Sequence, residues 1–193
     1  MFNNELGNQD TFKDLDWTEE QKQSKSFCDC VFEGCDFTKT DFSGTEFVDA
    51  IFQKCNLSLT DLNNCRLRSV VFVKSKLIGI DFRKCNPNFF SISFKNCLLD
   101  SCNFSCDFKY ATFDFCGSVL RKCIFIETDL HNTDFSECDL EETTFHNCNL
   151  EGADFIKAKN YQINPKTNKI KNAKFSLPEA VLLLGALDID LRN

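Results

Sequence analysis

The sequence predicts an all-β solenoid, and residues 123–155 carry the observations that predict it. A large apolar residue, here called the centre, stands at every fifth position of this stretch, and a small residue stands two positions before each centre. A period of five fits neither an α-helix, with 3.6 residues per turn, nor a long strand, in which side chains alternate every 2 residues. The seven centres are Phe125, Leu130, Phe135, Leu140, Phe145, Leu150 and Phe155.

Each five-residue repeat is expected to form a short strand and a corner. If the small residue and the centre face the same side, the three residues that span them form one strand, and the residue between them points outward. The remaining two residues then turn a corner. Repetition winds the chain into a coil with centres and small residues inside, and successive coils pair through their backbones at roughly 4.8 Å.

The chain is expected to contain one solenoid with an addition at each end. Residues 1–26 are polar and lack the small partners of the repeat, so they are expected to form an N-terminal cap over the exposed edge of the first coil. Residues 27–160 form the predicted solenoid. Glycine tolerates the awkward backbone angles of a corner. Three glycines stand at the second corner residue, namely Gly34, Gly44 and Gly79.

The repeat loses its phase first in residues 83–94. Pro87 stands where a centre is expected, and Phe94 resumes the pattern two residues late. Phe89 or Phe90 must then either lie outside the regular stack or replace the missing centre.

The phase changes again in residues 114–120. Ser118 stands where a centre is expected after Phe113, and the pattern resumes two residues late at Leu120. Each irregular segment has two interpretations. It is either a tolerated insertion at a corner or a loop that contacts a partner, since loops on a solenoid often carry binding residues.

Residues 161–193 are predicted to end the solenoid and to add a short C-terminal helix. Phe175 restores the phase twenty residues after Phe155, which predicts one distorted last coil. Ser176 and Glu179 resemble a helix capping box, and the tail LDIDL alternates like a strand.

The predicted helix, AVLLLGAL, is apolar nearly all round and must be covered. One face can cap the last coil, and a second copy of the chain would bury the surplus; the alternative is a simple cap on a monomer. The residues expected to form the dimer interface are Leu182, Leu183, Leu184, Leu187 and Ile189.

Thirteen cysteines raise the alternatives of disulfide bonds or a zinc site. Their positions favour packing instead, because eleven of them fall on the inward small position, where a compact side chain fits. His131 and His146 each follow a centre and should face solvent. We therefore expect no metal, no cofactor and no catalytic residue. The inward cysteines are Cys30, Cys35, Cys55, Cys65, Cys85, Cys97, Cys102, Cys106, Cys123, Cys138 and Cys148.

Composition points to a protein without membrane contact. The formal net charge is -7, and no run approaches the roughly 18 apolar residues of a membrane span. The N-terminal MFNNELGNQD has neither the basic nor the apolar region of a signal peptide. A cytoplasmic location is expected.

Charge is distributed unevenly along the predicted rod. Residues 62–86 hold six basic side chains and one acid, whereas no Lys or Arg stands between Lys122 and Lys157. If two copies meet at their C-terminal ends, their acidic bands merge into one zone, and a protein surface that binds DNA would be attracted to it. The alternative is a set of ordinary solvated side chains. The nine acids of the band are Glu127, Asp129, Asp134, Glu137, Asp139, Glu141, Glu142, Glu151 and Asp154.

The repeat resembles that of the pentapeptide-repeat family, whose signature is a small residue, Asp or Asn, Leu or Phe, and two variable residues. The resemblance covers about Cys30 to Phe155. It implies a right-handed quadrilateral β-helix with four pentapeptides per turn. Within the family the chain looks most like the Qnr and MfpA group, which implies dimerisation through the C-terminus, binding to DNA gyrase and an association with quinolone resistance.

Taken together, these features predict a homodimeric DNA mimic that binds DNA gyrase or topoisomerase IV and protects it from quinolones. We expect no direct nucleic-acid binding and no contact with membranes. Three alternatives stay open: an immunity factor against a gyrase-directed peptide toxin, a scaffold for another basic protein, and, with least support from the sequence, an enzyme.

Overall fold

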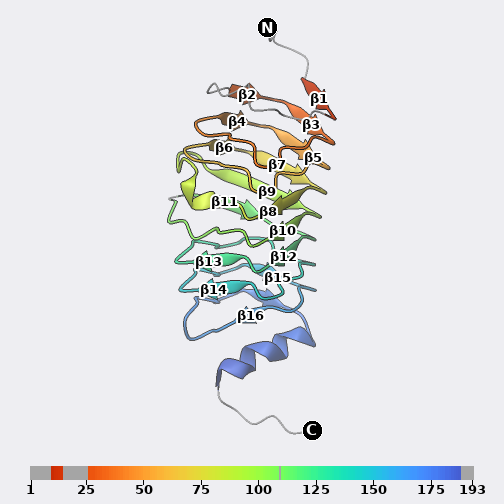
Figure 1. Ribbon diagram of the computed structural model, residues 1–193. Coiled ribbons are helices and arrows are strands. Elements are labelled where there is room, and N and C mark those ends of the chain that lie inside the picture. Colours follow the sequence, from red (N-terminus) through yellow and green to blue (C-terminus); the bar gives the residue numbers. More distant parts are fainter. Residues whose placement is uncertain (1–9, 15–25, 109, 188–193) are drawn as a thin grey trace.

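The computed structural model describes residues 10–14, 26–108 and 110–187. The chain forms a right-handed quadrilateral parallel β-helix, as predicted, with strand β1 at one end of the rod and the helix of residues 179–187 at the other (Figure 1). Four walls surround a filled interior. One regular turn uses twenty residues, because Thr11 pairs with Val31 and Val31 pairs with Ile51.

Wall 1 carries the longest ladder of strands. Its strands pair in the order β1-β3-β5-β7-β9-β11, and β15 pairs with β17 further along the same wall. Successive strands are parallel and directly stacked. They are β1 (Thr11–Lys13), β3 (Val31–Glu33), β5 (Ile51–Gln53), β7 (Val70–Val73), β9 (Ser91–Lys95), β11 (Thr112–Asp114), β15 (Asp154–Phe155) and β17 (Lys174–Phe175).

Walls 2, 3 and 4 follow wall 1 in chain order, and single bridges join many of their coils. Wall 2 contains β8 (Lys76–Ile78), β10 (Leu98–Asp100) and β12 (Val119–Arg121). Wall 3 contains the 3-10 helix η2 (Phe82–Lys84) and the strands β13 (Ile124–Ile126), β14 (Thr144–His146) and β16 (Gln162–Ile163). Wall 4 contains β2 (Ser26–Cys28), β4 (Glu46–Val48) and β6 (Arg66–Arg68).

The interior consists of stacked centres. On wall 1 each phenylalanine ring lies on the next, with centroids 4.8 to 5.3 Å apart and planes within 17° of parallel. Offset stacks of this kind add about 0.5–1.5 kcal/mol per pair to the area they bury. The column spans eight turns and contains Phe12, Phe32, Phe52, Phe72, Phe94, Phe115, Phe135, Phe155 and Phe175.

Phenylalanine columns also face each other across the interior. In the C-terminal half they occupy walls 1 and 3, and Leu centres occupy walls 2 and 4, as the alternation of Phe and Leu predicts. Rings from these opposite walls meet edge to face: Phe115 and Phe125 have centroids 5.6 Å apart, and Phe125 and Phe135 have centroids 6.0 Å apart.

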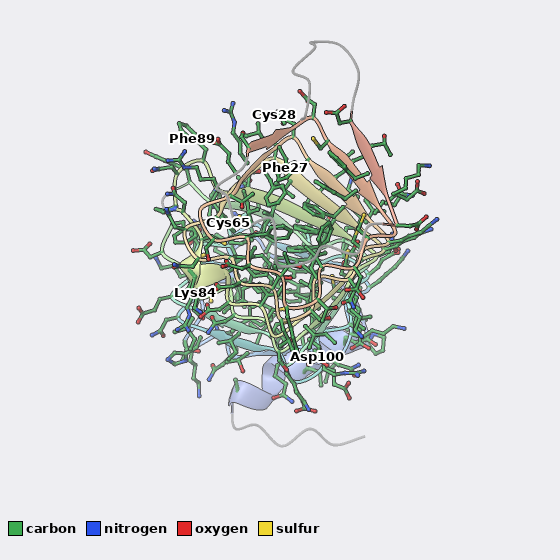
Figure 2. The ribbon with its side chains drawn as sticks, turned by 45° about the horizontal axis from the view of Figure 1, so that its top comes forward. Phe27, Cys28, Cys65, Lys84, Phe89 and Asp100 are labelled. Carbon is green, nitrogen blue, oxygen red and sulfur yellow. The ribbon has the colours of Figure 1, made fainter. Side chains whose placement is uncertain are left out.

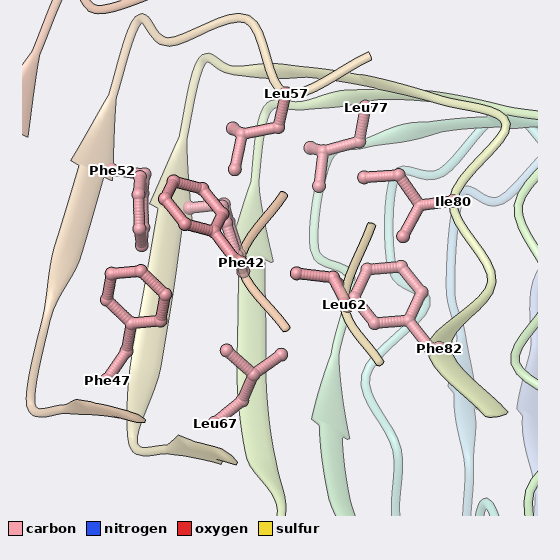
Figure 3. Close-up of a pocket in the computed structure, with 10 residues that line it drawn as sticks. Phe42, Phe47, Phe52, Leu57, Leu62, Leu67, Leu77, Ile80 and Phe82 are labelled. Atoms are coloured by element: carbon pink, nitrogen blue, oxygen red, sulfur yellow. The ribbon is translucent and has the colours of Figure 1, made fainter. Parts of the chain in front are cut away.

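The packing is looser in one coil of the N-terminal half. There Leu57, Leu62 and Leu67 provide three of the four centres, and their thinner side chains leave an apolar cavity of about 10 Å³ (Figure 3). Such a cavity has no polar partner for a water molecule and stays dry.

The small inward residues are hydrogen-bond donors as well as spacers. The hydroxyl of Ser75 donates to the carbonyl of Phe52 (3.0 Å), and the thiol of Cys138 donates to the carbonyl of Phe115 (2.9 Å). Each bond reaches a centre in the preceding coil, so a serine, threonine or cysteine satisfies a buried carbonyl that alanine would not. All thirteen cysteines are free thiols, and the eleven at inward positions are buried.

The corners explain why Asp or Asn precedes so many centres. The carboxylate of Asp41 accepts the backbone N–H of Ser43 (2.9 Å), and Asp134 accepts that of Ser136 (2.7 Å). Such bonds close the turn that follows the centre. The second corner residue adopts a left-handed conformation, with φ of 67° at Gly34 and 54° at Lys54.

The second irregularity in the repeat differs from the prediction. Phe115, not Phe113, is the wall 1 centre, because its ring stacks on that of Phe94 with centroids 5.3 Å apart. Leu120 follows five residues later, so the intervening segment is regular. Ser118 is therefore the small residue before Leu120 and not a failed centre; its hydroxyl donates to the carbonyl of Phe94 (3.2 Å).

The inserted residues occupy one corner, between walls 4 and 1, in consecutive coils. We call residues 89–91 and 110–112 the corner ledge. Thr112 pairs with Ser91, its N–H donates to the carbonyl of Phe90 (3.2 Å), and its hydroxyl bonds the hydroxyl of Ser91 (2.6 Å). The second insertion thus repeats the first, one coil further along.

Phe90 replaces the missing centre, and Phe89 lies outside. Phe90 is buried and its ring meets that of Phe108 edge to face at 5.1 Å. Pro87 is exposed, and Phe89 is 80% exposed and lies at the outside of the rod (Figure 2).

Both ends of the chain contribute to the rod. Within the expected N-terminal cap, residues 11–13 form the first rung of wall 1, and the ring of Phe12 stacks on that of Phe32. Residues 1–9 and 15–25 lie outside the described part. At the other end, β17 pairs with β15, which places Phe175 on Phe155 as expected.

The C-terminal helix departs from the expected capping box. The hydroxyl of Ser176 accepts the backbone N–H of Lys157 (2.8 Å), so it ties down the last coil and does not cap a helix. The helix itself is a 3-10 helix, η3 (Glu179–Leu187), which lies against β16 at the end of the rod (Figure 1). In the described part of the chain, no helix is long and apolar enough to cross a membrane.

Candidate interaction surface

The nine acids predicted to bind a partner all lie on the outside of the rod. Six are exposed, and Asp134, Asp139 and Asp154 are half-buried. They are spread over all four walls and their corners. Wall 1 has Asp134, Glu137 and Asp154, wall 2 has Asp139, Glu141 and Glu142, wall 3 has Glu127, and wall 4 has Asp129 and Glu151.

Stacking of coils brings basic side chains beside four of these acids, which the linear sequence conceals. A residue lies over the one twenty positions away, so cations that flank the acidic segment in sequence reach into it. The expected band of negative charge is therefore partly neutralised. The ion pairs are Arg121–Glu141 (2.9 Å), Lys122–Glu142 (3.9 Å), Lys157–Glu137 (2.9 Å) and Lys174–Asp154 (3.0 Å).

The electrostatic effect of these pairs is local. The hydrogen bond from Lys157 holds the pKa of the Glu137 carboxyl below its usual value and raises the pKa of Lys157. Among the described residues, Glu127 and Glu151 have no ion pair, and Asp129 contacts the ring of His131 (3.0 Å) and accepts a hydrogen bond from the side-chain amide of Asn149 (2.8 Å). In the same part of the chain Asp134 and Asp139 also have no ion pair, so acids without one lie on all four walls; on walls 3 and 4 they are Glu127, Asp129 and Glu151, with Lys169 and Lys171 on the next coil of wall 4.

Several basic residues of the N-terminal half also have partners within the chain. Arg83 is held by Asp81 (2.7 Å), and Arg66 lies 3.8 Å from Glu46. The guanidinium of Arg68 lies over the ring of Phe89, 5.7 Å from its centroid. Sequence reasoning did not assign this exposed pair to a surface, although the doubled phenylalanine in NPNFFSI shows that one ring lacks a place in the stack.

The apolar residues predicted to form a dimer interface are only partly available. Leu182 is 52% exposed, Leu183 packs against the core, and Leu184 is half-buried. The side chain of Leu187 and all of Ile189 lie outside the described part of the structure. Two apolar residues near this end that sequence reasoning did not select, Leu177 and Val181, are also exposed.

The buried thiols have the chemistry of packing groups. Burial raises the pKa of Cys65 and of Cys138 to about 12. These thiols stay protonated at neutral pH, and a protonated thiol is a poor nucleophile and a poor metal ligand.

Comparison with solved structures supports the same architecture. Two trypsin-treated variants of QnrB1, described as a plasmid-mediated fluoroquinolone resistance protein, are similar along nearly the whole chain. One is 20% identical, with a TM-score of 0.53, and covers 95% of this chain and 98% of its own. The other is 18% identical, with a TM-score of 0.57, and covers 96% of this chain and 100% of its own. At these identities the likeness concerns the fold.

Other comparisons give less detail. HetL, a pentapeptide repeat protein involved in heterocyst differentiation regulation in the cyanobacterium Nostoc, is 14% identical over 85% of this chain and 84% of its own, with a TM-score of 0.29. No protein with a curated description matches the sequence.

Two family models match the sequence of this chain. "Pentapeptide repeat region" matches residues 25–104, and "Pentapeptide repeats (8 copies)" matches residues 106–141 and 123–159. Together the matched segments span most of the solenoid. The stacked centres and the four-walled coils are the structure that this repeat forms. The chain belongs to the pentapeptide-repeat family.

Proposed function

We propose that this protein is a non-catalytic DNA mimic that binds a bacterial type II topoisomerase, DNA gyrase or topoisomerase IV, and protects it from quinolones. The observation that carries the proposal is a rod whose C-terminal half displays exposed carboxylates without a Lys or Arg ion pair, Glu127, Asp129 and Glu151, on walls 3 and 4. The likeness to the fluoroquinolone resistance protein QnrB1 over nearly the full chain supplies the candidate target.

The physical basis is charge complementarity. Duplex DNA presents one negative charge per roughly 1.7 Å, and enzymes that cleave it line their binding surface with cations. Carboxylates on consecutive coils stand about 4.8 Å apart along the rod, so Glu127, Asp129 and Glu151 form a short acidic strip. The rod would occupy the basic DNA-binding surface, compete with DNA and lower the population of drug-trapped cleavage complexes.

Dimerisation would lengthen the rod. Leu177, Val181 and Leu182, which we call the C-terminal patch, are exposed apolar side chains at the C-terminal end. A second copy is the partner proposed for this patch, because end-to-end contact buries both patches and joins the two acidic strips into one longer surface. A variant that places a charge in this patch should keep the fold and remain a monomer.

The test is a quinolone-induced cleavage assay with purified gyrase and topoisomerase IV. The wild-type protein should lower the amount of linear, cleaved DNA in a dose-dependent way. A variant with Glu127→Gln, Asp129→Asn and Glu151→Gln should protect at least about tenfold less well, because it loses the charges that approach the enzyme. The matched control, Glu141→Gln with Glu142→Gln, removes acids that Arg121 and Lys122 already pair and should protect nearly as well as wild type. No protection of either enzyme by the wild-type protein would refute the proposal.

A further inference from the structure

We propose that the groove between β16 and η3 is a docking site for the tail of the same chain, residues 188–193, which adds an extended segment to the open edge of β16. This docking does not depend on topoisomerase binding. It follows from the hydrogen-bonding groups of β16, from the lining of the groove and from the charge of the last coil.

The far edge of β16 is open. β16 is the last strand of the ladder β13-β14-β16, and among the described strands none pairs with its far side. In regular coils the N–H of a centre donates to the next coil, as Leu130 does to Asn149 (2.8 Å), and the carbonyl of a small residue accepts from it, as Thr128 does (3.0 Å). Ile163 and Tyr161 hold these two places in β16. The N–H of Ile163 and the carbonyl of Tyr161 therefore face the side without a coil, where an extended segment supplies a partner for both.

A groove of about 340 Å³ lies between β16 and the helix. The helix η3 crosses the end of the rod and lies against β16 (Figure 1). An edge strand on one side and a helix on the other form a cleft in which an extended peptide can bind by strand addition. The groove is lined by Tyr161, Gln162, Ile163, Asn164, Leu182 and Ala186.

One residue of this lining carries a polar group without a partner. Tyr161 is only 1% exposed, and its hydroxyl has no hydrogen-bond partner among the described residues. A buried hydroxyl is costly to leave unpaired. A tail that lies in the groove brings carbonyl and carboxylate acceptors to the residue that lacks one.

The last coil is basic and the tail is acidic, so their charges are complementary. Residues 156–178 contain six lysines and no acid, and exposed Lys159 and Lys166 flank β16 in the sequence. The tail contains two acids and one base. Its first four residues, DIDL, alternate acidic and apolar side chains, so an extended tail presents Ile189 and Leu191 on one side and both carboxylates on the other. The apolar side fits the groove and the acidic side fits the lysines around it.

The tether favours the tail of the same chain over the tail of a second copy. Ala186 lines the groove and the tail begins two residues later, so its local concentration is in the millimolar range. Six extended residues reach about 20 Å, whereas residues 161–164 span about 13 Å, which leaves length for a turn. Of the C-terminal patch only Leu182 lines the groove, so Leu177 and Val181 stay exposed for end-to-end contact.

Amide hydrogen exchange at Ile163 tests the proposal in the full chain. A docked tail covers this N–H, so exchange should be at least about tenfold slower in the wild type than in a variant with Ile189→Ser and Leu191→Ser. Leu177→Ser removes a leucine outside the groove and should leave the exchange unchanged. Equal exchange in the wild type and the tail variant would overturn the proposal.

Protein concentration distinguishes the two possible sources of the tail. Protection of the Ile163 N–H should be the same at about 10 μM and at about 1 mM protein, because docking within one chain does not depend on concentration. Protection that is lost on dilution would assign the groove to the tail of a second copy and would overturn the proposal.

Substitutions in the helix give an independent test. Ala186→Glu places a carboxylate in the groove, repels the acidic tail and should speed exchange at Ile163 at least about tenfold. Gly185→Glu is the matched control, because an added Cβ meets no atom within 4 Å there and the residue does not line the groove. Circular dichroism and thermal unfolding should show that both variants keep the fold. Equal exchange in these two variants would contradict docking in the groove.

A peptide measures whether the groove is accessible. A fluorescent peptide of residues 187–193 should bind the variant with Ile189→Ser and Leu191→Ser at least about tenfold more tightly than the wild type, whose groove its own tail already occupies. Fluorescence anisotropy gives both affinities. Equal affinity for the two proteins, or binding to neither, would overturn the proposal.

Discussion

Phe94 stacks on Phe115 with ring centroids 5.3 Å apart, although twenty-one residues separate them where twenty make a regular turn. The ring column thus continues without a gap across both irregular coils. The extra residues are absorbed at the corner ledge, where backbone and hydroxyl bonds join Ser91 to Thr112. Packing of the centres decides the register, and the corners adapt to it.

Adjacent phenylalanines of the ledge should differ sharply in their contribution to stability. Phe90→Ala should lower the free energy of unfolding by about 3–5 kcal/mol, because it leaves a cavity beside Phe108 and Phe113. Phe89→Ala should lower it by less than about 1 kcal/mol, because it removes only the exposed contact with Arg68. Urea unfolding measures both values, and equal effects would contradict the burial of Phe90 and the exposure of Phe89.

The buried cysteine thiols predict how alkaline pH changes the stability of the fold. Burial raises the pKa of Cys55, Cys65 and Cys138 to about 12, so the folded protein holds these protons more tightly than the unfolded chain. Their stabilising contribution is complete below about pH 8.5 and is lost as the pH rises toward 12. Each thiol lowers the free energy of unfolding by up to about 1.4 kcal/mol per pH unit in this range.

Urea midpoints measured between about pH 7.5 and about pH 11 test this linkage. Cys65→Ser should make the decline less steep, because serine does not ionise and already serves at an equivalent inward position in Ser75. Cys28→Ser should not change the slope, since Cys28 is exposed. A decline that is the same in all three proteins would exclude the buried thiol as its cause.

At a corner carboxylate, the contribution of the hydrogen bond can be distinguished from the contribution of the charge. Asp134→Ala removes the acceptor for the N–H of Ser136 and should cost about 1 kcal/mol of stability. Asp134→Asn keeps an acceptor and relieves repulsion from Asp114 and Asp154 on the neighbouring coils, so it should be neutral or slightly stabilising. Thermal unfolding of the two variants distinguishes them. A loss of stability in the asparagine variant equal to that in the alanine variant would show that the charge itself stabilises the corner.

Leu182→Asp should convert the predicted end-to-end dimer into a monomer without unfolding it, because the side chain is 52% exposed on η3. Leu59→Asp is a matched control: Leu59 is also 52% exposed but lies on the side of the rod. Light scattering after size exclusion gives both masses. A Leu182→Asp protein that remains dimeric at the same concentration would place the interface elsewhere.

Much of the fold follows from the five-residue period, because the period fixes which side chains are inward and where each corner lies. The period could not locate the second insertion. Phe113 in β11 and Phe115 just after this strand are both buried, and either can be taken for the centre. Only the contact between Phe115 and Phe94 decides between them. Likewise, the sequence predicted that Ser176 caps a helix, whereas its hydroxyl accepts the backbone N–H of Lys157 in the last coil.

The candidate surface was predictable in part. The outward direction of Glu141 follows from its position after a centre, and this prediction is confirmed. The pairing of Glu141 with Arg121 was also within reach, because four repeats of five residues place the two on adjacent coils. Phe89 was harder to assign, since sequence alone does not show which of two neighbouring rings the interior accepts.

The most direct test of topoisomerase binding is the equilibrium dissociation constant of the purified protein with DNA gyrase and with topoisomerase IV, measured by calorimetry at about 50 and about 200 mM salt. We predict binding to at least one of the enzymes, at least about tenfold weaker at the higher salt and abolished by an excess of duplex DNA. No detectable binding to either enzyme at the lower salt, or binding that duplex DNA leaves unchanged, would contradict DNA mimicry.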